Sequence, residues 1–372
     1  MVRRTATWAG ALAALLGASC GGSVGPARIA YPAPWIGTEL GTLAQAAIDG
    51  WGVPRVAEVS VAPKRDFGSG YAADIAFAEA VVGTPGVAAA VGPQSSMATL
   101  LVAPIYAEAG VPLISATATS DSLGGRSPWV FQLAPSNAAE GAFIAQFAIE
   151  RLGARRVTIF YLDADEYGLS LQDGVVRALR ARNVAPVDQV GFVEGADLPR
   201  RVDESLRRAT PDVVVVAARA TETLAIVRAL RARRPGVAVV AGDGVPMTAV
   251  FLRPAGAAAE GLYAVSWWNP DSADPRSREF AASYRRATGR PADAAAAMYY
   301  DAILLAATAI REAGPHPAAV RRWLAALGTT RAPYAGVTGP ISFAPGRRTN
   351  LLMMQIAAGA AAAVPGAEAS RP

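Results

Sequence analysis

The stretch of residues 87–123 constrains the fold most strongly, because it contains two apolar strands that are each followed by a polar turn. The run VAAAV at residues 87–91 predicts a short buried strand, and the turn at residues 94–96 begins a segment whose apolar residues recur at helical spacing. A second strand is predicted at residues 111–115, and residues 116–122 behind it carry four hydroxyl side chains. In a parallel α/β sheet both polar turns fall at the carboxyl ends of strands, where ligands bind.

Four hydroxyl residues of these two turns are therefore candidate ligand contacts: Ser95, Ser96, Thr117 and Thr119. The first turn of a helix has unpaired N–H groups and a partial positive charge. A serine there caps its own helix or helps to hold a carboxylate, and the two roles are compatible. Both interpretations stay open at this point.

The length of 372 residues allows two domains of roughly 150 residues each. Hydrophobic residues make up 52% and charged residues 17% of the chain, which favours a well-packed α/β protein over disorder. One histidine, His316, and one cysteine, Cys20, exclude most histidine-dependent hydrolases, histidine-rich metal sites and an internal disulfide. The net charge of +5 comes from scattered arginines without interleaved aromatics, so we expect no nucleic-acid binding.

The N-terminus has the pattern of a secretory signal peptide at residues 1–19. Arg3 and Arg4 precede an apolar run that is shorter than the ~20 residues of a membrane span. Residues 16–20 resemble a bacterial lipobox, which would place a lipid on the sulfur of Cys20, although Gly17 stands where leucine is usual. The alternative is an ordinary signal peptide with an incidental cysteine. Residues 20–27 are rich in glycine and would form a flexible tether.

The two polar turns together resemble the central motif of type I periplasmic binding proteins, in the branched-chain amino acid (Leu/Ile/Val) receptor family. That family pairs a GPxSS turn with a VPxIS…AT turn, which here read GPQSS and VPLISATAT. Further segments resemble the same family: WVFQLAPS at residues 129–136, DADEYG at residues 163–168 and YAGVTGPISF at residues 334–343. The resemblance implies an α/β fold of two Rossmann-like lobes, whose parallel-rich sheets are joined by a hinge with several crossings.

The resemblance also divides the chain. Lobe I is expected at residues 28–136 and 267–335, and lobe II at residues 137–266 and 336–364, followed by a disordered tail at residues 365–372. Crossings between the lobes are expected near residues 135–138, 265–268 and 334–337. Within lobe II, the residue pattern predicts helices over residues 174–182 and 224–233.

Two residues of lobe II are candidate ligand contacts by resemblance. The family places an aromatic residue over the ligand where Tyr167 stands, and an acid near the ligand's ammonium where Asp243 stands. An aspartate paired with an ammonium leaves neither charge unpaired. The alternative for Asp243 is a Gly-Asp-Gly turn on the surface.

The sequence leaves the roles of two further residues open. Trp35 lies in a shortened loop before the first predicted helix and is either a wall of the pocket or a packing residue. Arg219 follows the apolar strand VVVVA and would suit an anionic ligand group better than an ammonium, or it points to solvent. A metal site is not expected, because three acids adjacent in one turn rarely converge on an ion: Asp163, Asp165 and Glu166.

The resemblance implies an extracytoplasmic solute-binding protein that captures a small amino-acid-like ligand between its lobes and delivers it to an ABC importer. No cofactor is expected. The expected partners are the ligand, ABC permease subunits, and the membrane only through lipid on Cys20. We expect a monomer in the periplasm or on the outer face of a bacterial membrane.

Two other functional classes are alternatives for this sequence. A ligand sensor of the same fold would bind an amide, a urea-like molecule or a dicarboxylate and act on a membrane receptor or regulator. An enzyme is not expected, because the chain has no GxSxG, Walker, HExxH or CxxC pattern and no GxGxxG after a strand.

Overall fold

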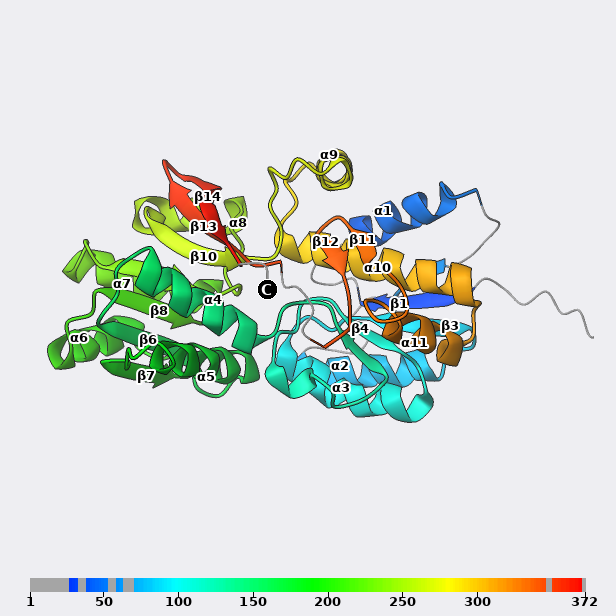
Figure 1. Cartoon of the computed structure of the whole chain (residues 1–372), viewed down its shortest axis with the longest axis horizontal. Coiled ribbons are helices and arrows are strands. Elements are labelled where there is room, and N and C mark those ends of the chain that lie inside the picture. The colour runs from blue at the N-terminus through cyan, green and yellow to red at the C-terminus, as the bar shows by residue number, and fades with distance from the viewer. Residues whose placement is uncertain (1–26, 33–37, 53–57, 63–69, 346–349, 370–372) are drawn as a thin grey trace, which may run out of the picture.

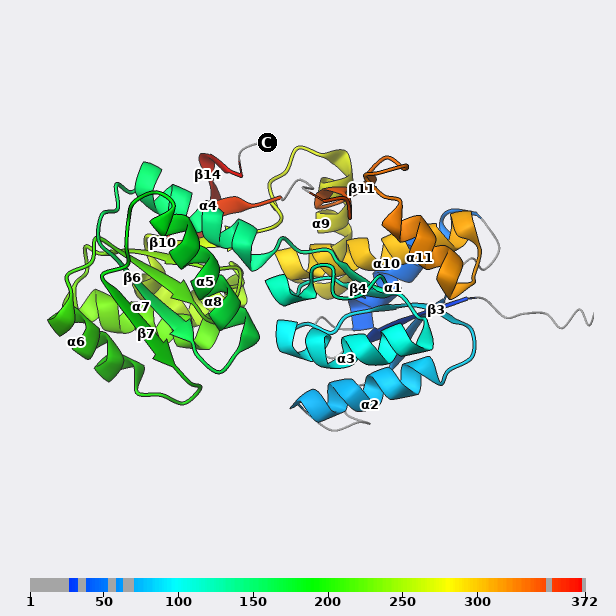
Figure 2. The same cartoon turned by 60° about the horizontal axis from the view of Figure 1, so that its bottom comes forward.

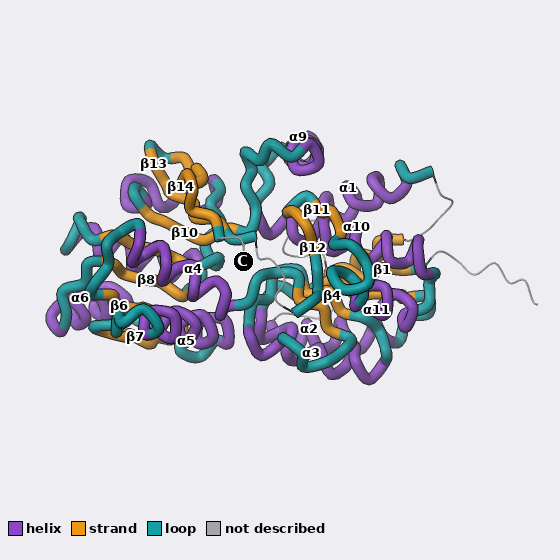
Figure 3. Tube along the Cα trace, in the orientation of Figure 1, coloured by secondary structure: helices purple, strands orange, loops and turns teal. Residues whose placement is uncertain are grey.

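The computed structural model describes residues 27–32, 38–52, 58–62, 70–345 and 350–369. Figure 1 shows two lobes side by side, each built of a sheet with helices on both faces, and Figure 2 shows the same two lobes after a 60° turn. The element order alternates strands and helices through most of the chain, as parallel α/β folds require (Figure 3). Cys20, Trp35 and the expected signal peptide and tether up to residue 26 lie outside the described residues.

Lobe I contains a five-stranded parallel sheet in the order β2-β1-β3-β4-β5. Its strands are β1 (Arg28–Pro32), β2 (Glu58–Ala62), β3 (Val87–Val91), β4 (Leu113–Ser115) and β5 (Val130–Gln132). Every residue of β3 is buried, because helices cover both faces of the sheet. Helices α2 (Gly70–Val82) and α3 (Ser96–Ala109) pack on one face. The other face packs against α1 (Thr38–Asp49), α10 (Ala294–Ala313) and α11 (Pro317–Ala325).

Lobe II contains a seven-stranded sheet in the order β14-β13-β10-β9-β8-β6-β7. Five of its strands are parallel: β6 (Val157–Leu162), β7 (Asp188–Phe192), β8 (Val213–Ala217), β9 (Ala238–Ala241) and β10 (Leu262–Ser266). Two antiparallel strands follow β10 at one edge: β13 (Leu352–Ala357) and β14 (Ala360–Glu368). The lobes together therefore have the parallel-rich α/β architecture that the sequence predicts.

The helices of lobe II cover both faces of its sheet. Alternate residues of a strand pack against the helices on opposite faces. Val213 and Val215 of β8 pack with α4 (Asn137–Glu150) and α5 (Glu166–Arg180). Val214 and Val216 pack on the opposite face, which is covered by α6 (Leu198–Arg208), α7 (Ala220–Arg233) and α8 (Ala249–Ala255). This alternation follows from the two-residue period of a strand.

Helix α10 is the one described helix that is long and apolar enough to cross a membrane by length and composition. Of its most apolar window, 72% is buried inside the protein. It contacts β1 and β3 of lobe I and is a core helix of that lobe.

The order of the described elements passes from one lobe to the other three times, and one expected crossing was misplaced. The first crossing connects β5 to α4, and the second connects β10 to α9 (Pro275–Thr288). The third was expected at residues 334–337, which is wrong, because these residues belong to the hairpin of β11 (Tyr334–Gly336) and β12 (Gly339–Ile341). Asp301 of α10 holds this hairpin in lobe I by accepting hydrogen bonds from the N–H groups of Val337 and Thr338. The chain joins the lobe II sheet only at β13.

Three other element boundaries differ from the sequence prediction. Helix α5 begins at Glu166 rather than at residue 174, because Asp165 caps it by accepting the N–H groups of Tyr167 and Gly168. Helix α7 begins at Ala220 rather than at residue 224, so its first turn is polar. The expected disordered tail is also wrong for residues 365–368, which belong to β14.

Candidate ligand-binding site

A cavity of about 450 Å³ is lined by residues of both lobes. Seven of the eight ligand contacts expected from the sequence line it: Ser95, Ser96, Thr117, Thr119, Tyr167, Arg219 and Asp243. The eighth, Trp35, lies outside the described residues. The structure therefore brings these seven expected contacts, which span 148 positions of the chain from Ser95 to Asp243, around one cavity.

The hydroxyl residues of lobe I bind the two polar turns to each other. Ser95 caps α3 by accepting the N–H of Ala98 at 3.2 Å. The Oγ atom of Ser96 accepts the N–H groups of Thr119 and Ser120, each at 3.2 Å, so it still has its own proton to donate. Thr117 donates its hydroxyl to the carbonyl of Gln94 at 2.8 Å. The first N–H groups of α3 lie beside these side chains and have no partner within the helix.

Asp243 of lobe II lies in the Gly-Asp-Gly turn that follows β9, and two helices hold this turn. The N–H of Asp243 donates to Oε1 of Glu140 on α4 at 2.9 Å, and the N–H of Gly244 donates to Oη of Tyr167 on α5 at 3.0 Å. A Cβ atom at Gly242 would lie 2.5 Å from Cδ2 of Leu171, so only glycine fits this turn without a shift.

Two neighbouring carboxyl groups, Asp243 of the turn and Glu140 of α4, have unpaired oxygens. Oδ1 of Asp243 and Oε2 of Glu140 are covered and have no hydrogen-bond partner among the described residues. Asp243 as a whole stays partly exposed and lines the cavity. Burial raises the pKa of Asp243 to about 6. Burial also raises the pKa of Glu140 well above its usual range, and the charge of Asp243 raises it further.

Tyr167 stands in the first turn of α5, directly beside this pair. Its pKa is raised by burial first and then by the charges of Asp243 and Glu140. Its aromatic ring lines the cavity while its hydroxyl contacts the turn. The site on lobe II is thus acidic and partly dehydrated, which suits a cationic group of a ligand.

Arg219 lines the cavity but is already neutralised by its own lobe. Its guanidinium forms ion pairs with Asp165 at 2.5 Å and with Glu194 at 2.7 Å. The sequence left open whether Arg219 selects an anionic ligand group or points to solvent, and the structure places its side chain at the cavity, 38% exposed, in these two ion pairs. Within the described part of the chain, no group of three acid, histidine or cysteine side chains has metal-binding geometry.

The remaining cavity wall is largely apolar and comes mainly from segments that sequence analysis did not assign to the site. Trp267 and Trp268 follow β10 at the second crossing, where the apolar run SWW was the available signal. Trp268 is held by its Nε1–H, which donates to Ser277 at 2.7 Å. Further apolar residues line the wall: Val245, Pro246, Met247, Val265, Ala292 and Met354.

Asp293 was also missed, although it lines the cavity at the start of α10. Its carboxylate caps that helix by accepting the N–H of Ala296 at 2.8 Å, and burial raises its pKa. Glu140 was missed as well, because a lone glutamate among small residues carries no sequence signal of its own.

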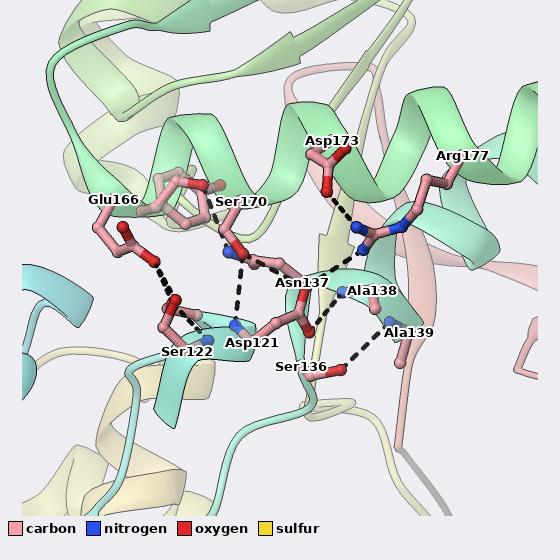
Figure 4. A network of polar contacts seen from close by, with 12 residues as sticks. Asp121, Ser122, Ser136, Asn137, Ala138, Ala139, Glu166, Ser170, Asp173 and Arg177 are labelled. Atoms are coloured by element: carbon pink, nitrogen blue, oxygen red, sulfur yellow. Dashed lines mark hydrogen bonds and ion pairs between the residues drawn. The ribbon is translucent and has the colours of Figure 1, made fainter. Parts of the chain in front are cut away.

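A polar contact between the lobes lies directly beside the cavity (Figure 4). Ser120 and Ser122 of lobe I donate their hydroxyls to Oε1 of Glu166, at 2.5 and 2.9 Å. Asp121 accepts the N–H of Ala138 in the first turn of α4 at 3.1 Å and lies 3.6 Å from Arg177 of α5. These contacts fix the first crossing next to Thr119 and Tyr167.

Comparison with known proteins places these observations in a family. A family profile described as periplasmic binding protein matches residues 61–361. The branched-chain amino acid transporter substrate binding protein LivJ from Streptococcus pneumoniae, in complex with isoleucine, is 25% identical with a TM-score of 0.78, over 91% of this chain and 99% of that chain.

Two other solved structures illustrate the range of similar proteins. An ABC transporter substrate-binding protein from Desulfitobacterium hafniense, in complex with Leu, is 26% identical with a TM-score of 0.76, over 91% of this chain and 99% of that chain. A solute binding protein from R. palustris, in complex with benzoate, shares the fold at 18% identity with a TM-score of 0.76, over 92% of this chain and 97% of that chain. No curated protein sequence matches the chain.

Proposed function

The chain belongs to the periplasmic binding protein family, and we propose that it is a type I substrate-binding protein that captures a neutral amino acid with an apolar side chain for an ABC importer. One observation carries this proposal. The acidic Gly-Asp-Gly turn of lobe II and the hydroxyl-rich helix start of lobe I line the same cavity, so one α-amino acid bridges them.

The carboxylate of the ligand would bind to lobe I. The hydroxyl proton of Ser96 and the first N–H groups of α3 supply donors there, and the helix N-terminus adds a partial positive charge. The ammonium would bind Asp243, whose carboxylate has no cationic partner among the described residues.

The apolar wall supports an apolar side chain. Trp267, Trp268 and Met354 offer no charged group to a ligand. Arg219 already faces the two carboxylates of Asp165 and Glu194, so a second ligand carboxylate would gain little from its charge, which disfavours dicarboxylates. The similar proteins from S. pneumoniae and D. hafniense were solved with isoleucine and Leu.

The role outside the cavity follows from the family. Proteins of this family are extracytoplasmic and bind solutes, so we expect capture and release without turnover and without a cofactor. We propose that the protein acts as a monomer, anchored by lipid on Cys20, and hands its ligand to ABC permease subunits. Mass spectrometry of the membrane-bound protein tests whether Cys20 carries a lipid. Separately, a Cys20→Ala change should release the protein from the membrane.

Calorimetry and thermal shift with matched ligands test the binding proposal. Leucine and isoleucine should bind, and each saturating ligand at 100 times its dissociation constant should add about 2.7 kcal/mol of stability. Leucinamide, which lacks the carboxylate, and 4-methylpentanoate, which lacks the ammonium, should each bind at least roughly tenfold more weakly, because one charge of the site is then unmatched. Preferential binding of glutamate, amides or urea would reject the proposed ligand class and favour the sensor alternative.

A further inference from the structure

Glu140 lies beneath the candidate site and does not itself line the cavity. Its side chain is fully buried, and one of its two oxygens, Oε1, accepts a hydrogen bond from the backbone N–H of Asp243. The other oxygen, Oε2, is unpaired, and so is the buried Oδ1 of Asp243. Two unpaired carboxyl oxygens on adjacent side chains are costly unless a proton lies between them.

The charged surroundings favour such a proton. From α5, the pair faces Tyr167, which is neutral. Across the cavity, Asp293 adds a further acid at the start of α10. The cation that lines the cavity, Arg219, is engaged by Asp165 and Glu194. No cation among the described residues therefore compensates a second negative charge on the Glu140–Asp243 pair.

We propose that Glu140 is a positioning residue that carries a proton and donates it to Oδ1 of Asp243, so that the pair presents one negative charge to one ammonium. This inference rests on the proposed function for the identity of the ligand. Glu140 thereby fixes both ends of Asp243, its N–H through Oε1 and its carboxylate through Oε2. The Asp243 carboxylate also receives a hydrogen bond from Tyr167, and its remaining acceptor positions are left to the ligand.

The proposal excludes the alternative in which Glu140 is an ionised second counter-charge. Two ionised carboxylates would attract an ammonium more strongly than one, but they would repel each other in a buried site. They would also favour dications over a neutral amino acid. The two arrangements predict different leucine affinities when Glu140 is replaced by a neutral side chain of the same shape.

Leucine binding by two variants of Glu140 distinguishes these arrangements. Glu140→Gln retains an oxygen for the N–H of Asp243 and supplies an amide N–H for its carboxylate, so the affinity should stay within about threefold of the unchanged protein. Glu140→Leu removes both partners and should weaken binding by about tenfold or more. A tenfold or greater loss in Glu140→Gln would overturn the proposal, because it would show that the charge of Glu140 is needed.

A second measurement needs no ligand. Burial raises the pKa of Glu140 in the folded protein, so its protonated form stabilises the fold, and this stability is lost as the pH rises above the ordinary glutamate range through the raised value. Denaturant unfolding should therefore show Glu140→Gln gaining stability relative to the unchanged protein between pH 4 and pH 8. A difference that stays constant with pH would overturn the proposal.

The two measurements separate this inference from the proposed function. If the unchanged protein binds no amino acid, the proposed function fails, and the ligand-free unfolding series still decides the protonation of Glu140. If leucine binds but Glu140→Gln loses affinity, only the role of Glu140 fails. Poor folding of Glu140→Leu would leave the comparison of Glu140→Gln with the unchanged protein intact.

Discussion

Gly141 of α4 lies against Gly174 of α5 so closely that a Cβ atom on Gly141 would be 2.4 Å from the carbonyl carbon of Gly174. This contact sets the distance between the second turn of α4 and the middle of α5. Glu140 and Tyr167, which hold the Gly-Asp-Gly turn, belong to these same helices. The geometry of the candidate site therefore depends on backbone contact between two small residues.

Gly141→Ala should destabilise the protein, because the added methyl group meets the backbone and can be accommodated only by separating the helices. We expect a loss of about 1–3 kcal/mol in the free energy of unfolding, measured by urea denaturation. Gly236→Ala is the matched control, because nothing lies within 4 Å of a Cβ atom there. A Gly141→Ala variant as stable as this control would contradict the proposed close contact.

Asp243→Asn should weaken leucine binding by roughly thirtyfold, or about 2 kcal/mol, because the ligand's ammonium loses its charged partner while the shape is kept. Titration calorimetry measures this change. Asp271→Asn removes an exposed aspartate that does not line the cavity and serves as the control. Equal leucine affinities of the two variants would show that Asp243 does not bind the ligand.

The sequence predicts this site in part, and the reason lies in how far apart its interacting residues are. Ser95, Ser96 and Thr119 belong to turns next to strands, so their place at a sheet edge follows from local pattern. Glu140 and Asp243 are 103 positions apart, and their meeting depends on the α4–α5 contact. No local pattern encodes that contact, so Glu140 was not found.

The same argument explains the errors in the fold. The start of α5 was missed because Asp165 was considered as one of three acids rather than as a helix cap. Strand β14 was missed because an alanine-rich segment has little strand preference of its own, and its pairing with β13 supplies the missing stabilisation. The third crossing was misplaced because a buried carboxylate on α10 holds the hairpin, which is a contact across 36 positions.

Ser96→Ala should lower both stability and affinity. The N–H groups of Thr119 and Ser120 lose their buried acceptor, at a cost of about 1–3 kcal/mol, and the ligand's carboxylate loses a donor. Ser95→Ala is the comparison, because loss of the α3 cap costs about 1 kcal/mol of stability without removing that acceptor. If Ser96→Ala binds leucine as tightly as the unchanged protein does, the role of the Ser96 hydroxyl is rejected.

Arg219→Gln should leave leucine affinity within about threefold, because the proposed ligand makes no ion pair with this guanidinium. Stability should fall by about 1–3 kcal/mol, since the change leaves the buried carboxylate of Asp165 without its cation, whereas the pair with Glu194 is exposed. Parallel titrations with leucine and glutamate check this prediction. A large loss of affinity for either amino acid would show that Arg219 contacts the ligand.

Asp301 should make the stability of the β11–β12 hairpin depend on pH. Its buried carboxylate accepts the N–H groups of Val337 and Thr338 at 2.7 and 2.9 Å and the hydroxyl of Thr338 at 2.6 Å. Burial nevertheless raises the pKa of Asp301 to about 6. Because the folded-state pKa exceeds the unfolded value, the stability that this group contributes is present below about pH 4 and is lost as the pH rises through about 6.

Asp301→Asn removes this titration, so its unfolding free energy identifies the contribution of the carboxyl group. The unchanged protein should exceed the variant in stability by more at pH 4 than at pH 7, and the difference should shrink by roughly 2 kcal/mol over that interval. Urea denaturation at one-unit pH steps measures it. Since the cavity carboxylates Asp243 and Glu140 titrate equally in both proteins, their contributions cancel in the difference. A constant difference would mean that the hydrogen bonds from the hairpin fully offset the burial of the Asp301 charge.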